Sequence, residues 1–242
     1  MAEFKFPSEE VELPSKGLVY PTDHPLSSGK IEIKYMTAKE EDILTNQSYI
    51  KKGTVLNKLL DSVIVTEGVK QQDLILGDKN AVLIATRILG YGSEYKFTYR
   101  GEEKSVDLSI LENTEFDESL ITKGKNEFNF TLPNSKTPVT YKILTGIDES
   151  KIERELEGLK KINKNASPEL STRLKYIITS VNGEYDTKAV REFVDNYLLA
   201  IDSKALRKHL RENQPDVNLR YTDEDGKEVP IPIGLGFFWP EL

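Results

Sequence analysis

The stretch 54–66 reads TVLNKLLDSVIVT and has the apolar spacing of a helix that packs on a core. Its apolar residues follow the i, i+3, i+4, i+7 pattern and are Val55, Leu56, Leu59, Leu60, Val63 and Ile64. Before this stretch, Thr37 and Glu40 have the spacing of a capping box, which predicts a helix over about 37–49. After it, Asp78 caps a third expected helix, which ends near Gly90 and Gly92.

From residue 94 onward, the sequence changes to hairpins and further helices. Alternating segments around short turns predict three hairpins, at 94–108, 127–144 and 217–233. Capping residues and apolar periodicity predict four helices between the last two hairpins, at 148–163, 168–181, 187–200 and 203–213. This order lacks the strand–helix alternation of a parallel sheet. We therefore expect an α+β fold that is mainly helical, with small antiparallel β-hairpins set apart from the helices.

The first thirty residues have little periodicity. Their four prolines exclude a helix and are Pro7, Pro14, Pro21 and Pro25. We expect residues 1–30 to form an extended N-terminal arm that contacts a partner surface, with a disordered tail as the alternative. A short strand is expected over 30–35. The remainder is expected to divide near Gly146 into the segments 31–146 and 147–242, unless both share one core.

Composition narrows the class of protein. The 242 residues include 33 Lys and Arg against 40 Asp and Glu, for a net charge of −7 and a pI near 5.2. Such an acidic balance argues against a general nucleic-acid binder. The absence of cysteine excludes disulfides and thiolate metal sites. No secretory signal and no apolar segment of membrane-spanning length is found, so we expect a soluble intracellular protein.

Residues that could carry catalysis are few. His24 and His209 are expected to be surface histidines, and no Gly-x-Ser-x-Gly or phosphate-binding loop occurs. The acidic segment 223–226 is interpreted as a hairpin turn because it lacks the later glutamate of a calcium loop. We therefore expect no catalytic residue, metal or cofactor. A basic face at 204–211 is interpreted either as a solvated surface or as a contact for an acidic partner or one phosphate backbone.

Three aromatic residues, Phe237, Phe238 and Trp239, lie together near the C-terminal end of the sequence. They could fold back into the core, or they could anchor a partner protein, because aromatic residues dominate interface hot spots. In an extended segment, Phe237 and Trp239 would share one face and Phe238 would occupy the other. One face could then pack on the protein while the other is offered to a partner.

Five blocks in order carry a family resemblance: 13–20 (LPSKGLVY), 36–44 (MTAKEEDIL) with 50–54 (IKKGT), 77–80 (GDKN), 91–95 (YGSEY) and 236–240 (GFFWP). Together they resemble the T-even-type bacteriophage baseplate protein family, which includes the hub subunit and hub-assembly proteins of contractile tails. Many of these relatives carry Cys-x-x-Cys pairs at hairpins like 94–108 and 217–231. Because this chain has no cysteine, a zinc role is not transferred to it.

The resemblance implies a non-enzymatic baseplate protein that acts in hub assembly, either as a structural subunit or as a chaperone. Its partners would be other baseplate and hub proteins or a second copy, without nucleic acid or membrane. It would act in the host cytoplasm during assembly and either leave or stay in the virion tail. The predicted partner-binding residues are Leu13, Pro14, Tyr20, Phe237, Phe238 and Trp239. A carboxylate-dependent cell-wall hydrolase is the alternative, and a DNA-associated regulator is a third class.

Overall fold

The computed structural model describes residues 7–162, 168–223 and 226–238. Within these ranges the chain forms eight α-helices and nine strands. All sheets among these residues are antiparallel, with two or three strands each. The predicted α+β fold, mainly helical with small antiparallel sheets, is confirmed. Within the same ranges, no helix is long and apolar enough to cross a membrane.

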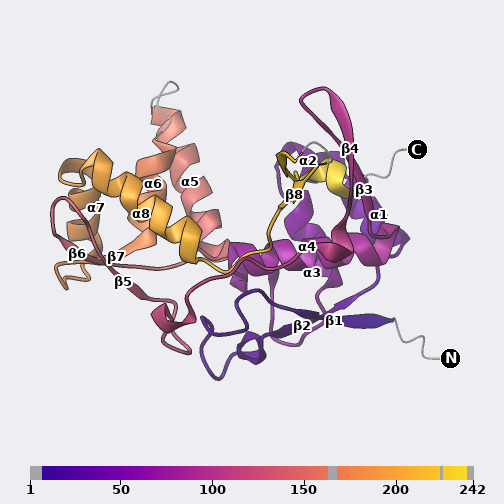
Figure 1. The fold of residues 1–242 in the computed structure, drawn as a ribbon, viewed down its shortest axis with the longest axis horizontal. Coiled ribbons are helices and arrows are strands. Elements are labelled where there is room, and N and C mark those ends of the chain that lie inside the picture. The colour runs from indigo at the N-terminus through magenta and orange to yellow at the C-terminus, as the bar shows by residue number, and fades with distance from the viewer. Residues whose placement is uncertain (1–6, 163–167, 224–225, 239–242) are drawn as a thin grey trace.

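The chain forms two lobes that lie next to each other (Figure 1). The N-terminal lobe contains β1 (Ser8–Glu12), β2 (Lys30–Lys34), α1 (Ala38–Thr45), α2 (Gln47–Lys51), α3 (Val55–Val63), α4 (Leu76–Tyr91), β3 (Glu94–Tyr99), β4 (Glu102–Asp107), β8 (Arg220–Thr222) and β9 (Glu228–Pro230). The helical lobe contains β5 (Phe128–Thr131), β6 (Pro138–Tyr141), α5 (Gly146–Ile162), α6 (Glu169–Ile177), β7 (Ile178–Val181), α7 (Thr187–Asn196) and α8 (Ala200–Asn213). Short 3-10 helices are η1 (Pro25–Ser28), η2 (Gln71–Asp73), η3 (Leu108–Ile110), η4 (Glu118–Leu120) and η5 (Leu235–Phe238).

The apolar stripe of α3 is the centre of the N-terminal lobe. Leu59, Leu60 and Val63 have no exposed surface, as the spacing of the sequence predicts. The helix expected over 37–49 is instead two helices, because Asn46 interrupts it. The Asn46 side chain accepts hydrogen bonds from the backbone N–H groups of Ser48 and Tyr49 and so caps α2. An asparagine that bonds to its own backbone in this way starts a new helix.

The N-terminal arm is folded into this lobe. β1 pairs with β2 in register from Ser8 opposite Lys34 to Glu12 opposite Lys30. The backbone N–H of Leu13 then donates to the Gly29 carbonyl oxygen at 2.8 Å. The prediction of an extended arm over 1–30 that contacts a partner surface is corrected for residues 7–30, since its strand pairs inside the same chain. Residues 1–6 lie outside the described range.

The helix predicted over 168–181 stops at Ile177, and the chain continues as strand β7. β7 pairs with β6, so the hairpin of β5 and β6 becomes a three-stranded sheet. The segment 178–181 reads ITSV, and β-branched residues of this kind pack well on a pleated surface. Residues 178–181 form a strand because they pair with β6, and this pairing outweighs local helix propensity.

The last hairpin returns from the helical lobe to the N-terminal lobe (Figure 1). The Tyr221 ring meets the Phe97 ring edge-on, with centroids 6.2 Å apart. Lys104 Nζ lies 3.3 Å from Asp223 Oδ2, which joins the β3–β4 hairpin to the β8–β9 hairpin. The segment 147–242 is therefore not a separate unit. One hydrophobic cluster extends from Leu13 to Phe238, which agrees with the alternative of a shared core.

Close backbone contacts join the two lobes. A Cβ added to Gly77 would lie 1.9 Å from the Pro215 carbonyl oxygen, and one added to Gly146 would lie 2.7 Å from Gln72 Cα. Ile75 pairs with Thr145 in an isolated bridge, and Asn113 pairs with Val217 in another. We call these contacting segments, 74–77, 113–114, 145–146 and 214–218, the junction. Glycine at two of its positions lets backbones approach more closely than any other residue would.

Candidate partner-binding groove

The predicted partner-binding residues of the arm lie in the protein's own core. Leu13 and Tyr20 are 2% and 5% exposed, and Pro14 is also buried. The turn between them has Lys16 and Gly17 at positive φ. The interpretation of Leu13, Pro14 and Tyr20 as partner contacts is therefore corrected. In this structure their side chains stabilise the N-terminal lobe, because apolar groups at the end of a strand pack onto the helices beneath it.

Asp78 links this turn to the first turn of α4. Its fully buried carboxylate accepts hydrogen bonds from Ser15 N at 2.9 Å, Ser15 Oγ at 2.7 Å and Tyr20 Oη at 2.6 Å. Burial raises the pKa of Asp78, although these hydrogen bonds oppose the shift. Burial and the Asp78 charge raise the pKa of Tyr20 well above its ordinary value. Because the polar groups satisfy one another out of contact with solvent, the cluster acts on stability.

The C-terminal aromatic residues are also core residues, as far as they are described. Phe237 and Phe238 are each 1% exposed and lie in the 3-10 helix η5, so they do not alternate between faces as in a strand. The Phe237 ring meets the Tyr95 ring edge-on at 4.8 Å. This burial agrees with the alternative that the two rings fold back into the core and corrects the prediction of Phe237 and Phe238 as partner-binding residues. The 3-10 helix also replaces the extended segment in which they would present opposite faces. Trp239 lies outside the described residues.

Arg87 binds the backbone of the C-terminal aromatic segment. It is 5% exposed, and its guanidinium donates to three backbone carbonyl oxygens: Phe237 at 2.9 Å, Gly92 at 2.7 Å and Glu94 at 3.1 Å. Burial lowers the pKa of Arg87. A planar guanidinium suits this role because its donors diverge in a fixed fork that can reach three carbonyl oxygens on two chain segments at once.

The two histidines have structural partners. His24 accepts a hydrogen bond from the Leu26 backbone N–H at 3.2 Å and caps η1. His209 is half-buried, stacks on Phe130 with centroids 4.5 Å apart and shares a 2.9 Å hydrogen bond with Tyr141 Oη. Burial lowers the pKa of His209. The expectation that His209 is a surface histidine is thereby corrected.

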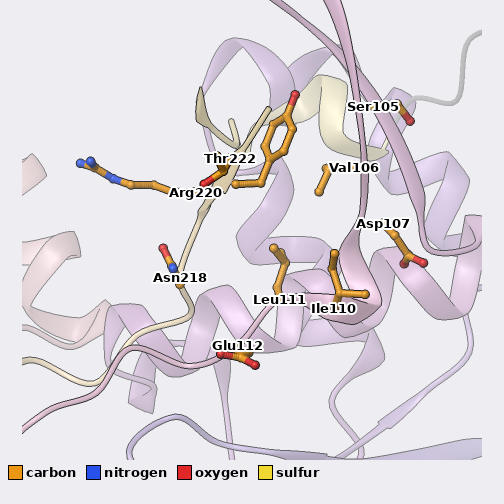
Figure 2. A pocket seen from close by; sticks show the side chains of 10 residues that line it. Ser105, Val106, Asp107, Ile110, Leu111, Glu112, Asn218, Arg220 and Thr222 are labelled. Atoms are coloured by element: carbon orange, nitrogen blue, oxygen red, sulfur yellow. The ribbon is translucent and has the colours of Figure 1, made fainter. Parts of the chain in front are cut away.

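Carboxylates do not gather into a metal site among the residues that the structure describes. Two of them, Asp107 and Glu112, line a pocket of about 370 Å³ between β4, η3 and β8 (Figure 2). Asp107 accepts hydrogen bonds from Ser109 N and Ser109 Oγ, which lower its pKa. A glycosidase acid needs a raised pKa. In Figure 2 the Asp107 carboxylate also points away from the space between the strands.

A second hollow, a groove at the junction, is a better candidate for partner binding than the pocket between β4 and β8. Two adjoining pockets of about 220 and 200 Å³ share Arg211 and Gln214. α8 forms one wall, and the segment 214–220 forms the floor of the second pocket. Leu76, Leu144 and Ile177 supply apolar surface, and Leu76 is 49% exposed. We call this hollow the junction groove.

The rim of the junction groove is cationic in a chain that is acidic overall. The first pocket has four cationic side chains, Lys142, Arg173, Arg207 and Arg211, and one carboxylate, Glu149. Arg173 NH1 lies 2.7 Å from Glu149 Oε1, and Lys142 Nζ lies 2.7 Å from Asp148 Oδ1. Arg207 and Arg211 are exposed, and neither forms an ion pair with a carboxylate within the described part of the chain. These two guanidiniums therefore keep their charge available.

Comparison with models of protein families, with curated proteins and with solved structures found no match to this chain.

The sequence indicates a basic helix face that forms part of this groove, although it does not predict the groove. The basic face at 204–211 was evident, and two of its four cations, Arg207 and Arg211, line the groove while Lys204 and Lys208 do not. Leu76, Leu144 and Ile177 gave no signal, because each reads as an ordinary core residue. Their meeting depends on how the two lobes join, which no local pattern encodes.

Proposed function

We propose that this protein is a non-enzymatic component of bacteriophage contractile-tail baseplate assembly, acting at the hub as a structural subunit or an assembly chaperone. The resemblance of the five sequence blocks to T-even-type baseplate proteins is the basis of the proposal. The observation that carries it is the way in which those blocks meet in the fold.

Blocks far apart in the sequence are direct partners in space. Ser15 and Tyr20 of the block 13–20 bond to Asp78 of the block 77–80. Tyr95 of the block 91–95 packs on Phe237 of the block 236–240. A change in one block therefore affects its partner block, since a buried residue is constrained by its neighbours.

The remaining block belongs to the same arrangement. Glu40 of the block 36–44 has no exposed surface and accepts hydrogen bonds from Lys34, Thr37 and Ser62. The Met36 side chain fills the space beside Gly90, where an added Cβ would lie 2.2 Å from Met36 Cε. The five blocks thus contribute to one lobe of this chain, the N-terminal lobe.

The proposal is tested in the phage whose genome encodes the chain. A nonsense mutation in the gene should yield heads and defective tails by electron microscopy, and the wild-type gene on a plasmid should restore infectious particles. Normal plaques from the nonsense mutant in a non-suppressing host would overturn the proposal. A matched missense control is Gly158→Ala, a position with no neighbour within 4 Å, which should assemble normally.

Mass spectrometry of purified mature virions separates the two forms of the proposal. A stoichiometric amount of the chain means a structural subunit, and its absence from virions that needed it for assembly means a chaperone. The prediction that the chain is not an enzyme is tested by incubating the purified protein with peptidoglycan. Release of soluble fragments would replace the proposal with the hydrolase alternative.

A further inference from the structure

We propose that the junction groove binds an acidic, leucine-containing segment of a partner protein, with Arg207 and Arg211 as its carboxylate-binding residues. The inference rests on the proposed function in one respect, since an assembly protein acts by binding other proteins. It names the chemistry of the partner and the surface that receives it.

Arg207 and Arg211 lie on the side of α8 that faces the junction groove. They are four residues apart on α8, so they lie on the same face one turn apart. Both line the groove, while Lys204 and Lys208 of the same helix do not. Arg207 donates through Nε to the Ser203 carbonyl oxygen at 3.3 Å, which fixes the base of its side chain. Its terminal nitrogens have no ion-pair partner among the residues that the structure describes, so they can form a bidentate pair with a carboxylate.

Apolar surface lies beside the two arginines in the same pocket. Leu76, Leu144 and Ile177 line the same pocket, and about half of the Leu76 side chain is exposed. An exposed leucine next to cationic side chains suits a ligand that is itself mixed, with aliphatic and acidic residues. A nucleic-acid backbone would use the charges and leave this apolar surface wet.

The net charge of the chain and the local charge of the groove act differently on a long polyanion and on a short acidic segment. The chain has a net charge of −7, so a long polyanion is repelled by most of its surface. A short acidic segment experiences mainly the groove, because charges beyond about 8 Å are screened at physiological ionic strength. In the second pocket the carboxylate of Asp216 accepts hydrogen bonds from Asn80 Nδ2 at 3.0 Å and from Val217 N at 2.8 Å. Those bonds hold the Asp216 carboxylate to neighbouring groups of the fold.

The groove is also rigid enough to act as a binding site. The segment 214–218 forms its floor. Hydrogen bonds join this segment to residues 112–114, which come much earlier in the chain. Thr114 N donates to the Asp216 carbonyl oxygen at 2.8 Å, and Asn218 N donates to the Glu112 carbonyl oxygen at 2.8 Å. A site built on paired backbone loses little entropy when a ligand binds.

Fluorescence anisotropy with the purified full chain tests the inference. The probe is a fluorescein-labelled peptide of sequence GLEDGLEDG, and its matched control is GLQNGLQNG, which has the same shape without charge. Wild-type protein should bind the acidic probe saturably and should bind the amide control at least about tenfold more weakly. Equal affinity for the two peptides, or no binding of the acidic probe, would overturn the inference.

Two charge-matched double variants locate the site. Arg207→Glu with Arg211→Glu should weaken binding of the acidic probe by about tenfold or more. Lys204→Glu with Lys208→Glu makes the same change in net charge outside the groove, and should weaken binding by no more than about twofold. Equal losses in both variants would mean a general charge effect and would overturn the inference. If the first double variant does not fold by circular dichroism, Arg211→Gln alone replaces it.

The apolar part of the groove and the competing class of ligand have their own measurements. Leu76→Ser should weaken binding of the acidic probe by about threefold, because one leucine contact is lost. A labelled DNA duplex that binds more tightly than the acidic peptide would identify a phosphate site and overturn the inference. All of these assays use isolated protein, so their failure leaves the phage nonsense-mutant result unaffected.

Discussion

The Tyr20 hydroxyl donates a 2.6 Å hydrogen bond to the buried carboxylate of Asp78, which lies 58 residues further along the chain. The same oxygen accepts a hydrogen bond from the Ile75 backbone N–H at 3.1 Å. One phenol group therefore joins the arm, the start of α4 and the junction. This relationship makes Tyr20 a structural residue and gives the first prediction.

Replacement of Tyr20 by Phe should destabilise the protein by about 1–3 kcal/mol, because Asp78 and the Ile75 N–H each lose a buried partner. Urea denaturation followed by circular dichroism measures the free energy of unfolding. The control is Tyr185→Phe, at a residue that is 57% exposed, where a change below about 0.5 kcal/mol is expected. A Tyr20→Phe protein as stable as wild type would contradict the structural role of this hydroxyl.

Alanine at Gly77 should cost about 2–4 kcal/mol of stability, because its Cβ would overlap the Pro215 carbonyl oxygen, 1.9 Å away. Backbone at the junction has to move to relieve that contact. Gly158→Ala in α5 has no neighbour within 4 Å and should stabilise the protein by up to about 1 kcal/mol. Thermal melts of both variants check the pair, and similar melting temperatures would mean that the junction is not closely packed.

Phe238→Ala should cost about 3–5 kcal/mol of stability, since the ring is 1% exposed and its removal leaves a cavity. An interface anchor would behave differently, with lost partner binding and an almost unchanged melting temperature. Differential scanning calorimetry separates the two outcomes. Tyr197→Ala, at a residue that is 63% exposed, is the control and should change stability little.

Glu40 should make stability depend on pH in the acid range. Burial alone would raise its pKa, but hydrogen bonds from Lys34, Ser62 and Thr37 outweigh burial and lower the pKa to about 2 from an ordinary 4.5. Because the folded pKa is lowered, the stabilisation is complete above pH 4.5 and is lost as the pH falls toward 2.

The Glu40→Gln variant measures this contribution. It should be less stable than wild type by about 2 kcal/mol at pH 7, and the difference should shrink between pH 4.5 and pH 2. Asp42→Asn, at an exposed carboxylate of the same helix, should differ from wild type by less than about 0.5 kcal/mol at every pH. A Glu40→Gln difference that stays constant with pH would show that the ionised carboxylate is not the stabilising group.

Local patterns along the chain predict the class of fold and most of its elements. Some features are local signals that involve only residues close together in the sequence. They are the apolar stripe of α3, the capping box at Thr37 and Glu40 and the turns of the hairpins. Helix periodicity also placed Arg207 and Arg211 on one face. Local signals of this kind survive folding because each is satisfied within its own element.

The positions of residues 7–30 and 235–238, the path of strand β7 and the groove depend on tertiary structure. Residues 178–181 become a strand because β6 offers an unpaired edge, and the arm folds because β2 pairs with β1. Phe237 and Phe238 are core residues because their segment packs on Arg87 of α4 and Tyr95 of β3. Both of these residues lie more than a hundred residues earlier in the chain. The junction groove exists only where α8, α6 and the start of α4 meet. Pairing and packing between distant segments depend on the whole chain, so no local pattern of residues can specify them.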